Sequence, residues 1–294
     1  MSVYKRSYRP YTGPVTGTQS QFFALARYAI AEAWSTRVTA VLFVLCFVPS
    51  LFSMITIYIM NNDAVRMLLG GARGGPPLIA MDEKFFYGVM IAQCWPALVL
   101  TAWVGPRLIS TDMSNNALAI ILSHPITRTE YVLAKLTVMA GLLSAVTWLP
   151  LLLLFVFQSH LATTSWGASH IGIALGMFLG SWIWIILLSL MALALASWVK
   201  WRIVATGLLF GFVFVPAGIG TVFNAVMRSN WGNLVNIPFM MATLWRRLVH
   251  APIADFMAKR EPSTLAILLS LVVICLLCIA ALSTRIRARE VVRG

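Results

Sequence analysis

The polar side chains best suited to specific contacts gather in one segment, residues 105–136, which separates two long apolar runs. This length is long for a connection between two adjacent helices. Leu118, Ile121 and Leu122 follow the i, i+3, i+4 spacing of a short amphipathic helix. Two interpretations of this helix fit the pattern equally: an ordinary interfacial helix on the inner leaflet, and a surface on which a partner protein pushes.

Two further signals predict how this segment is divided. Pro125 ends the short helix, because its ring cannot continue the hydrogen-bond ladder. Thr127 or Thr129 can cap the next helix, which carries Glu130 in its first turn and Lys135 at the membrane edge. The sequence therefore predicts a short transverse helix, a sharp stop, and a second helix that enters the following apolar run.

Residue patterns of the common catalytic centres are missing from the sequence. The four histidines lie at or beyond the ends of the apolar runs, where they suit neither haem ligation nor a metal site: His124, His160, His170 and His250. There is no G-x-S-x-G elbow. No Gly-Lys dipeptide occurs, so the phosphate-binding loop of P-loop ATPases is absent. We therefore expect no enzyme and no catalytic, metal or cofactor-binding residue, and the energy for any transport must enter through a partner.

Composition places the chain in a membrane. Hydrophobic residues make up 60% of it and charged residues 11%, against about 45–50% and about 25% in globular domains. A soluble fold with so few charges would be unable to cover its own surface. The formal net charge of +13 is spread over short segments between apolar runs, so anionic lipid headgroups and membrane topology explain it better than nucleic acid does.

Six apolar stretches reach the roughly 20 residues that a membrane-crossing helix needs. They are residues 38–60, 85–104, 136–157, 171–199, 203–223 and 264–282. None contains Asp, Glu, Lys, Arg or His, so they lack the usual residues of proton relays and voltage sensors. Of the 22 Lys and Arg residues, 14 fall in the segments on the side of the two termini. The positive-inside rule therefore predicts that the N-terminal segment 1–37 and the basic tail 283–294 are both cytoplasmic.

Two segments outside the spans also have helical patterns. Residues 21–36 predict an in-plane interfacial helix, one side of which is marked by Phe22, Ala26, Ala29 and Ala33. Residues 224–263 are too apolar for a free loop, and we expect them to pack on or dip into the outer half of the bundle. Their helical spacing, interrupted only by Pro238, is set by Leu234, Ile237, Met241, Leu244 and Leu248.

Small residues and prolines within the spans bear on helix packing. Glycines four residues apart, which let helices approach closely, are Gly172, Gly176 and Gly180 in the fourth span and Gly207 and Gly211 in the fifth. In the fourth span, packing within one subunit is favoured over contact with a second copy. Four prolines lie inside spans and can kink them: Pro49, Pro96, Pro150 and Pro216.

Residues 105–136 resemble the signature region of type-2 ATP-binding-cassette exporter permeases, the branch that includes the permease of the nitrous-oxide-reductase maturation system. The matching residues are Asp112, Leu118, Ile121, Leu122, Pro125, Thr127, Arg128 and Lys135. The sequence departs from the family pattern at Asn116 and Ala117, where Gly-Thr is common, and at Ala134, where Gly usually precedes Lys. The six-span layout, the helix before the first span and the apolar segment before the last one extend the resemblance over most of the chain.

The resemblance implies an all-α permease subunit in the bacterial inner membrane, surrounded by lipid and paired with a second copy or a paralogue. It would dock on a cytoplasmic ATPase subunit that holds ATP and Mg. The segment between spans 2 and 3 would be the coupling helix, the segment before span 6 would gate the exit, and Gly207 and Gly211 would lie at a dimer interface with span 1. The ATPase-facing residues would be Asp112, Asn116, Leu118, Ile121, Leu122, His124, Pro125, Arg128 and Glu130.

The main alternative keeps the same fold without transport. In it, the chain is a membrane anchor or assembly subunit of a larger membrane complex. A polytopic membrane enzyme is the weaker rival, because the sequence shows no cluster of polar catalytic residues at one membrane face.

Overall fold

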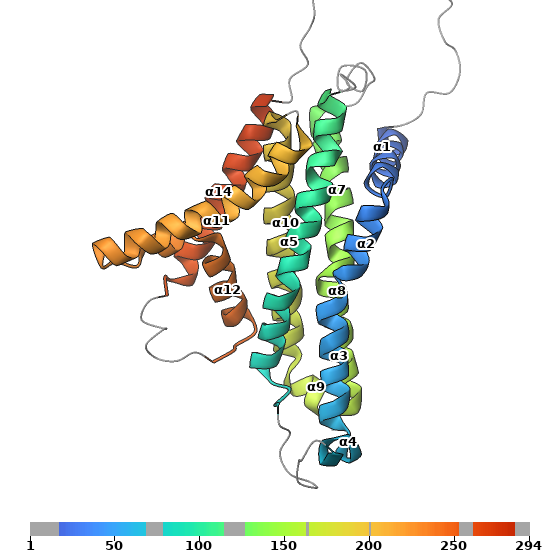
Figure 1. Cartoon of the computed structure of the whole chain (residues 1–294), viewed down its shortest axis with the longest axis vertical. Coiled ribbons are helices and arrows are strands. Elements are labelled where there is room, and N and C mark those ends of the chain that lie inside the picture. The colour runs from blue at the N-terminus through green and yellow to red at the C-terminus, as the bar shows by residue number, and fades with distance from the viewer. Residues whose placement is uncertain are drawn as a thin grey trace, which may run out of the picture.

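The computed structural model describes residues 18–68, 79–114, 127–162, 165–199, 201–252 and 261–285, and every element among them is helical (Figure 1). The elements are α1 (Thr18–Ala33), α2 (Arg37–Leu45), α3 (Val48–Asn61), α4 (Asp63–Leu68), α5 (Glu83–Ser114), α7 (Arg128–Val146), α8 (Trp148–Leu161), α9 (Trp166–Ser169), α10 (Ile171–Trp198), α11 (Arg202–Met227), the 3-10 helix η1 (Trp231–Leu234), α12 (Ile237–Leu248) and α14 (Thr264–Arg285).

Six helical stretches are long and apolar enough to cross a membrane. Called spans 1 to 6 from here on, they are Arg37–Asn61, Glu83–Asp112, Arg128–Leu161, Ile171–Trp198, Arg202–Met227 and Thr264–Arg285. The prediction of an all-α protein with several membrane spans is confirmed. The end of the bundle that contains α1, the last turns of α5 and the first turn of α7 is called the α1 end below (Figure 1).

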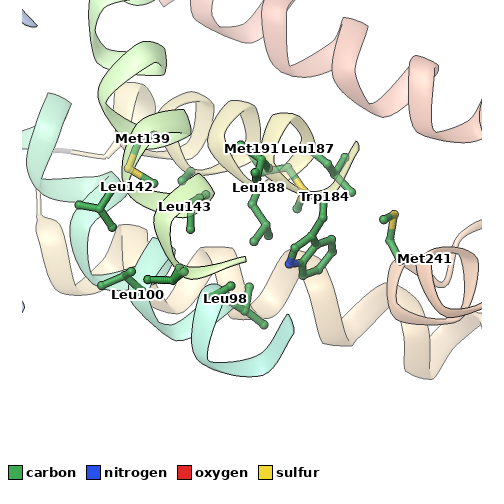
Figure 2. Close-up of a cluster of buried hydrophobic side chains, with 14 of the residues drawn as sticks. Leu98, Leu100, Met139, Leu142, Leu143, Trp184, Leu187, Leu188, Met191 and Met241 are labelled. Atoms are coloured by element: carbon green, nitrogen blue, oxygen red, sulfur yellow. The ribbon is translucent and has the colours of Figure 1, made fainter. Parts of the chain in front are cut away.

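The core lies where α5, α7, α10 and α12 meet. Figure 2 labels some of the side chains of this cluster: Leu98 and Leu100 of α5, Met139, Leu142 and Leu143 of α7, Trp184, Leu187, Leu188 and Met191 of α10, and Met241 of α12. In span 4, which is α10, 67% of the apolar stretch is buried, against 17% in span 6. The continuous helices α5 and α10 therefore form the centre of the bundle, and α14 lies at its edge.

Spans 1 and 3 are each broken in the middle, whereas spans 2 and 5 continue through their prolines. Span 1 is interrupted between α2 and α3, where Pro49 lies in the first turn of the new helix. Span 3 is interrupted at Thr147, whose backbone has φ −111° and ψ −94°, and Pro150 follows in the first turn of α8. Pro96 of α5 and Pro216 of α11 lie inside uninterrupted helices.

Spans 2 and 3 reach further toward the α1 end than the hydropathy of the sequence predicts. α5 continues to Ser114 and α7 begins at Arg128, whereas the predicted apolar stretches end at residue 104 and begin at residue 136. The helices thus include Arg107, Asp112 and Lys135, which are buried because each has a polar partner. The short helix predicted around Leu118 to Leu122 falls in residues 115–126, outside the described residues.

The apolar segment before span 6 packs against α10 through α12. Pro238 lies in the first turn of α12, where a missing N–H is tolerated, so it starts this helix rather than interrupting it. Asn236 caps the helix by accepting a hydrogen bond from the Phe239 N–H at 3.0 Å. The Trp245 indole N–H donates to the Gly180 carbonyl at 2.9 Å, so α12 is joined to α10 by a polar contact as well as by packing.

The close approach of α12 to α10 predicts different outcomes for two glycines of the same helix. A Cβ at Gly176 would meet the backbone of Leu248, with its carbonyl carbon only 2.7 Å away. Gly176→Ala should therefore cost about 1–3 kcal/mol by overpacking and lower the thermal unfolding midpoint in detergent. A Cβ at Gly172 has nothing within 4 Å, so Gly172→Ala is the matched control and should not lower the midpoint. Equal midpoints for the two variants would contradict this packing.

Candidate functional site

Four side chains from three helices meet at the α1 end and form what we call the three-helix junction: Glu32 of α1, Asp112 of α5, and Tyr131 and Lys135 of α7. The Lys135 ammonium lies 3.0 Å from Asp112 Oδ2 and 3.3 Å from Glu32 Oε2. The Tyr131 hydroxyl donates to Asp112 Oδ2 at 2.7 Å. One lysine thus joins carboxylates of two other helices, and one carboxylate receives two donors from α7.

The junction is buried. Lys135 and Tyr131 are 0% exposed and Asp112 is 3% exposed. Burial of an isolated charge costs several kcal/mol, so these groups persist inside the bundle because each charge has an opposite charge in contact. If one partner is removed, the other is left as an uncompensated buried charge, which makes the three helices dependent on one another.

Capping at the start of α7 sets the position of Tyr131 and Lys135. The Thr127 hydroxyl accepts from the Glu130 N–H at 3.2 Å, and the Glu130 carboxylate accepts from the Thr127 N–H at 2.7 Å. This reciprocal capping box selects Thr127 from the two caps that the sequence allows. Glu130 is therefore engaged within α7, whereas the neighbouring Arg128 is exposed.

α1 packs on α7, and most of its buried side chains are small. Ala29 and Ala33 are fully buried, and Leu25 and Ala26 nearly so. This face brings the backbone of α1 near α7 and places Glu32 beside Lys135. The exposed side of α1 and the residue just after it carry Phe23, Tyr28, Ile30 and Trp34, the residue types of a membrane interface.

Hydrogen bonds outside the junction hold the end of α5 from two further directions. Arg107 donates to the hydroxyls of Thr36 and Ser35, in the connection between α1 and α2. Ser110 donates to the Val199 carbonyl at 3.0 Å, just beyond α10. The last turns of α5 are thus tied to α7, to the end of α10 and to the connection between α1 and α2.

The junction contains two carboxylates for one lysine, and this imbalance affects Glu32. Burial raises the pKa of the Glu32 carboxyl above its usual range, because the charged form loses hydration. Lys135 opposes this rise in the pKa, and the negative charge of Asp112 adds to it. The Glu32 carboxyl therefore holds its proton more tightly in the folded protein than in water.

The arrangement fixes three helices relative to one another through ion pairs and a hydrogen bond. Within the part of the chain that the structure describes, no three His, Cys, Asp or Glu side chains are grouped so that they could hold a metal ion. Residues 115–126 connect the end of α5 to the start of α7 in the sequence, so the junction lies close to both points at which the described chain meets this segment.

The predicted site residues fall into three groups. Asp112 is part of the junction, and Arg128 and Glu130 lie in the first turn of α7. Six predicted residues lie outside the described residues: Asn116, Leu118, Ile121, Leu122, His124 and Pro125. Gly176 and Gly180 face α12, whereas an added Cβ would meet nothing within 4 Å at Gly172, Gly207 or Gly211.

The partnership of Glu32, Tyr131 and Lys135 is not visible in the local sequence patterns. These patterns place Glu32 away from the marked side of an interfacial helix and Lys135 at the membrane edge. One sequence feature could have predicted the junction: a lysine at the start of an apolar run, with acids at the ends of two other helices. Ionisable residues near the interior of a bundle usually pair with one another.

No protein-family model matches this chain, and no curated protein matches it. The resemblance of residues 105–136 to exporter permeases therefore stays a prediction.

The raised pKa of Glu32 predicts a pH-dependent difference in stability between the wild type and Glu32→Gln. Because the folded state holds this proton more tightly than the unfolded state, whose pKa is near 4.5, ionisation of Glu32 destabilises the fold. As the pH rises from about 4.5 through the raised pKa, the wild type should lose stability that Glu32→Gln does not lose.

Thermal unfolding in detergent across this pH range measures the difference. The unfolding midpoint of Glu32→Gln minus that of the wild type should increase with pH and then level off. A difference that is flat, or that decreases with pH, would contradict the raised pKa of Glu32.

Proposed function

We propose that this chain is the membrane-spanning permease subunit of an ATP-binding-cassette exporter, moved by a separate cytoplasmic ATPase through residues 105–135. The observation that carries the proposal is the three-helix junction, together with the resemblance of the segment beside it. Residues 115–126 are followed by α7 and preceded by α5, and charged side chains of these two helices form an ion pair. A segment that receives force from a partner needs such a firm connection to the bundle.

The distribution of basic residues supports the orientation that this function needs. The positive-inside pattern, with 14 of 22 Lys and Arg residues on the side of the termini, favours a cytoplasmic α1 end. In the proposed complex, residues 115–126 face the cytoplasm of a bacterial cell, and the ATPase subunit binds there with its ATP and Mg.

The lack of an ATP-binding motif in this sequence supports a permease subunit that depends on a separate ATPase. The sequence has no phosphate-binding loop of the G-x-x-x-x-G-K type. The partly buried Glu32 and the buried Asp112 and Lys135 lie together at one end of the bundle, where opposite charges are in contact. A proton path needs such groups at successive depths across the membrane, so a coupling role suits this cluster better.

The outer surfaces of spans 1 and 5 support an assembly with lipid and a second permease subunit. Only 22% of the apolar stretch of each span is buried within the chain. In Figure 1, α11 leans away from the central helices α5 and α10. We propose that a second copy or a paralogue covers part of this apolar surface and that lipid covers the rest.

Charge reversal at Arg128 tests the docking surface with little effect on the junction. Arg128 is exposed and the capping box uses Thr127 and Glu130 instead, so Arg128→Glu should leave the fold intact. We expect the wild type, purified from its native membrane, to bring down an ATPase with a Walker A motif and to stimulate its ATP hydrolysis. Arg128→Glu should lose most of both.

Lys84→Glu is the matched control, since Lys84 is a cation in the first turn of α5, at the other end of the bundle. Equal binding and ATP turnover for the Arg128→Glu and Lys84→Glu variants would contradict docking at residues 105–135. Recovery of a membrane complex without an ATPase would favour the anchor function instead.

A further inference from the structure

A single amide side chain in the middle of the bundle contacts both broken spans. Gln93 of α5 is 2% exposed. Its Nε2 group donates to the Cys46 carbonyl at 2.6 Å and also to the Val146 carbonyl. Its Oε1 atom accepts from the Ser50 hydroxyl at 3.0 Å. Both backbone partners are carbonyl oxygens, which can only accept, so the NH₂ group of Gln93 must face them. Each of its two hydrogens then forms one of the two hydrogen bonds.

The two carbonyls lie at the two helix breaks. Cys46 is between α2 and α3. Val146 is the last residue of α7, and in a continuous helix its carbonyl would accept from residue 150. Residue 150 is a proline and has no N–H to donate. The side chain of Gln93 therefore supplies a donor that the broken backbone lacks.

An apolar surrounding makes this donor hard to replace. Unsatisfied backbone groups in a bilayer core cost several kcal/mol each, so both carbonyls favour staying within reach of Gln93. Any change in the bend of span 1 that moves Cys46 displaces the amide that also holds Val146. The two breaks are thus linked through one side chain.

The halves of spans 1 and 3 beyond the breaks are linked to each other as well. α3 and α8 pack side by side, and at their far ends Asn61 Nδ2 donates to Gln158 Oε1 at 2.8 Å. Gln158 is 4% exposed. α3 and α8 are therefore joined to each other at their far ends by the Asn61–Gln158 hydrogen bond. Near the breaks, Gln93 contacts Ser50 of α3 and the Val146 carbonyl, which lies two residues before α8.

A small cavity lies beside the breaks. It has a volume of about 10 Å³, which is room for about one water molecule, and Gln93 and Thr147 line it together with Trp184 of α10 and Trp245 of α12. The cavity leaves local freedom at Thr147, the residue with irregular backbone angles. The continuous helices α5 and α10 supply the rigid frame on the other side.

We infer that Gln93 is the joint of a coupled hinge, about which the outer halves of spans 1 and 3 (α3 and α8) move as one unit against the continuous α5. The inference goes beyond the proposed function and does not depend on an ATPase. It concerns how this chain changes shape, and its test uses the purified chain alone.

Spin labels at exposed positions measure this motion. The labels go on Val41 of α2, Ile55 of α3, Val99 of α5 and Leu153 of α8, all of which are exposed, in a background with the four cysteines replaced by serine or alanine. Distances are measured by EPR in lipid nanodiscs for pairs that join α3 to α5, α8 to α5, α3 to α8, and α2 to α5.

Gln93→Leu keeps the bulk of the side chain and removes its hydrogen bonds. We expect the α3–α5 and α8–α5 distance distributions both to broaden by several ångströms, while the α3–α8 and α2–α5 distributions stay as narrow as with Gln93. Thr101→Val is the matched control, because Thr101 is also a buried polar residue of α5 but its hydroxyl donates to Ala97 of its own helix. This variant should leave all four distributions unchanged.

Four outcomes would overturn the hinge. In the first, no distribution broadens in Gln93→Leu. In the second, only one of the α3–α5 and α8–α5 distributions broadens, so the breaks are independent. In the third, the α3–α8 distribution broadens equally, so the two helices are not a unit. In the fourth, Thr101→Val gives the same changes as Gln93→Leu.

Discussion

Charged groups and backbone carbonyls inside a membrane protein find their partners within the protein, because lipid offers none. This constraint explains the main features of the structure. Lys135 is tolerated because Asp112 and Glu32 surround it, and the carbonyls at the breaks of spans 1 and 3 are tolerated because Gln93 reaches both. In each case one side chain joins helices from three parts of the chain.

The same constraint divides the bundle into a frame and attached parts. α5 and α10 are continuous through the membrane, and their packing supplies much of the core. α1 is attached at one end through Glu32, and α3 and α8 are attached beyond the breaks. Since α5 carries both Gln93 and Asp112, it is the element that connects the three-helix junction to the proposed hinge.

Parts of this architecture are predictable from the sequence and others are not. Hydrophobic length alone predicts six spans, and Thr127 and Glu130 are recognisable as helix-start residues. Hydropathy does not predict the full length of spans 2 and 3. It scores Asp112 and Lys135 as isolated charges, although in the fold they neutralise each other. The Lys135–Glu32 contact and the two acceptors of Gln93 join residues far apart in the sequence, so neither local spacing nor propensity could reveal them.

The central claim is that force on residues 115–126 reaches the bundle through the Asp112–Lys135 ion pair. Its most direct test is ATP hydrolysis by the partner ATPase in liposomes with Asp112→Lys, Lys135→Asp, or both changes together, each in a Glu32→Gln background, because the Glu32 carboxylate would repel an aspartate at position 135. We predict that each single variant loses the stimulation of ATP hydrolysis and that the charge-swapped pair recovers much of it. Full stimulation by a folded single variant, or no recovery in a folded charge-swapped pair, would contradict the claim.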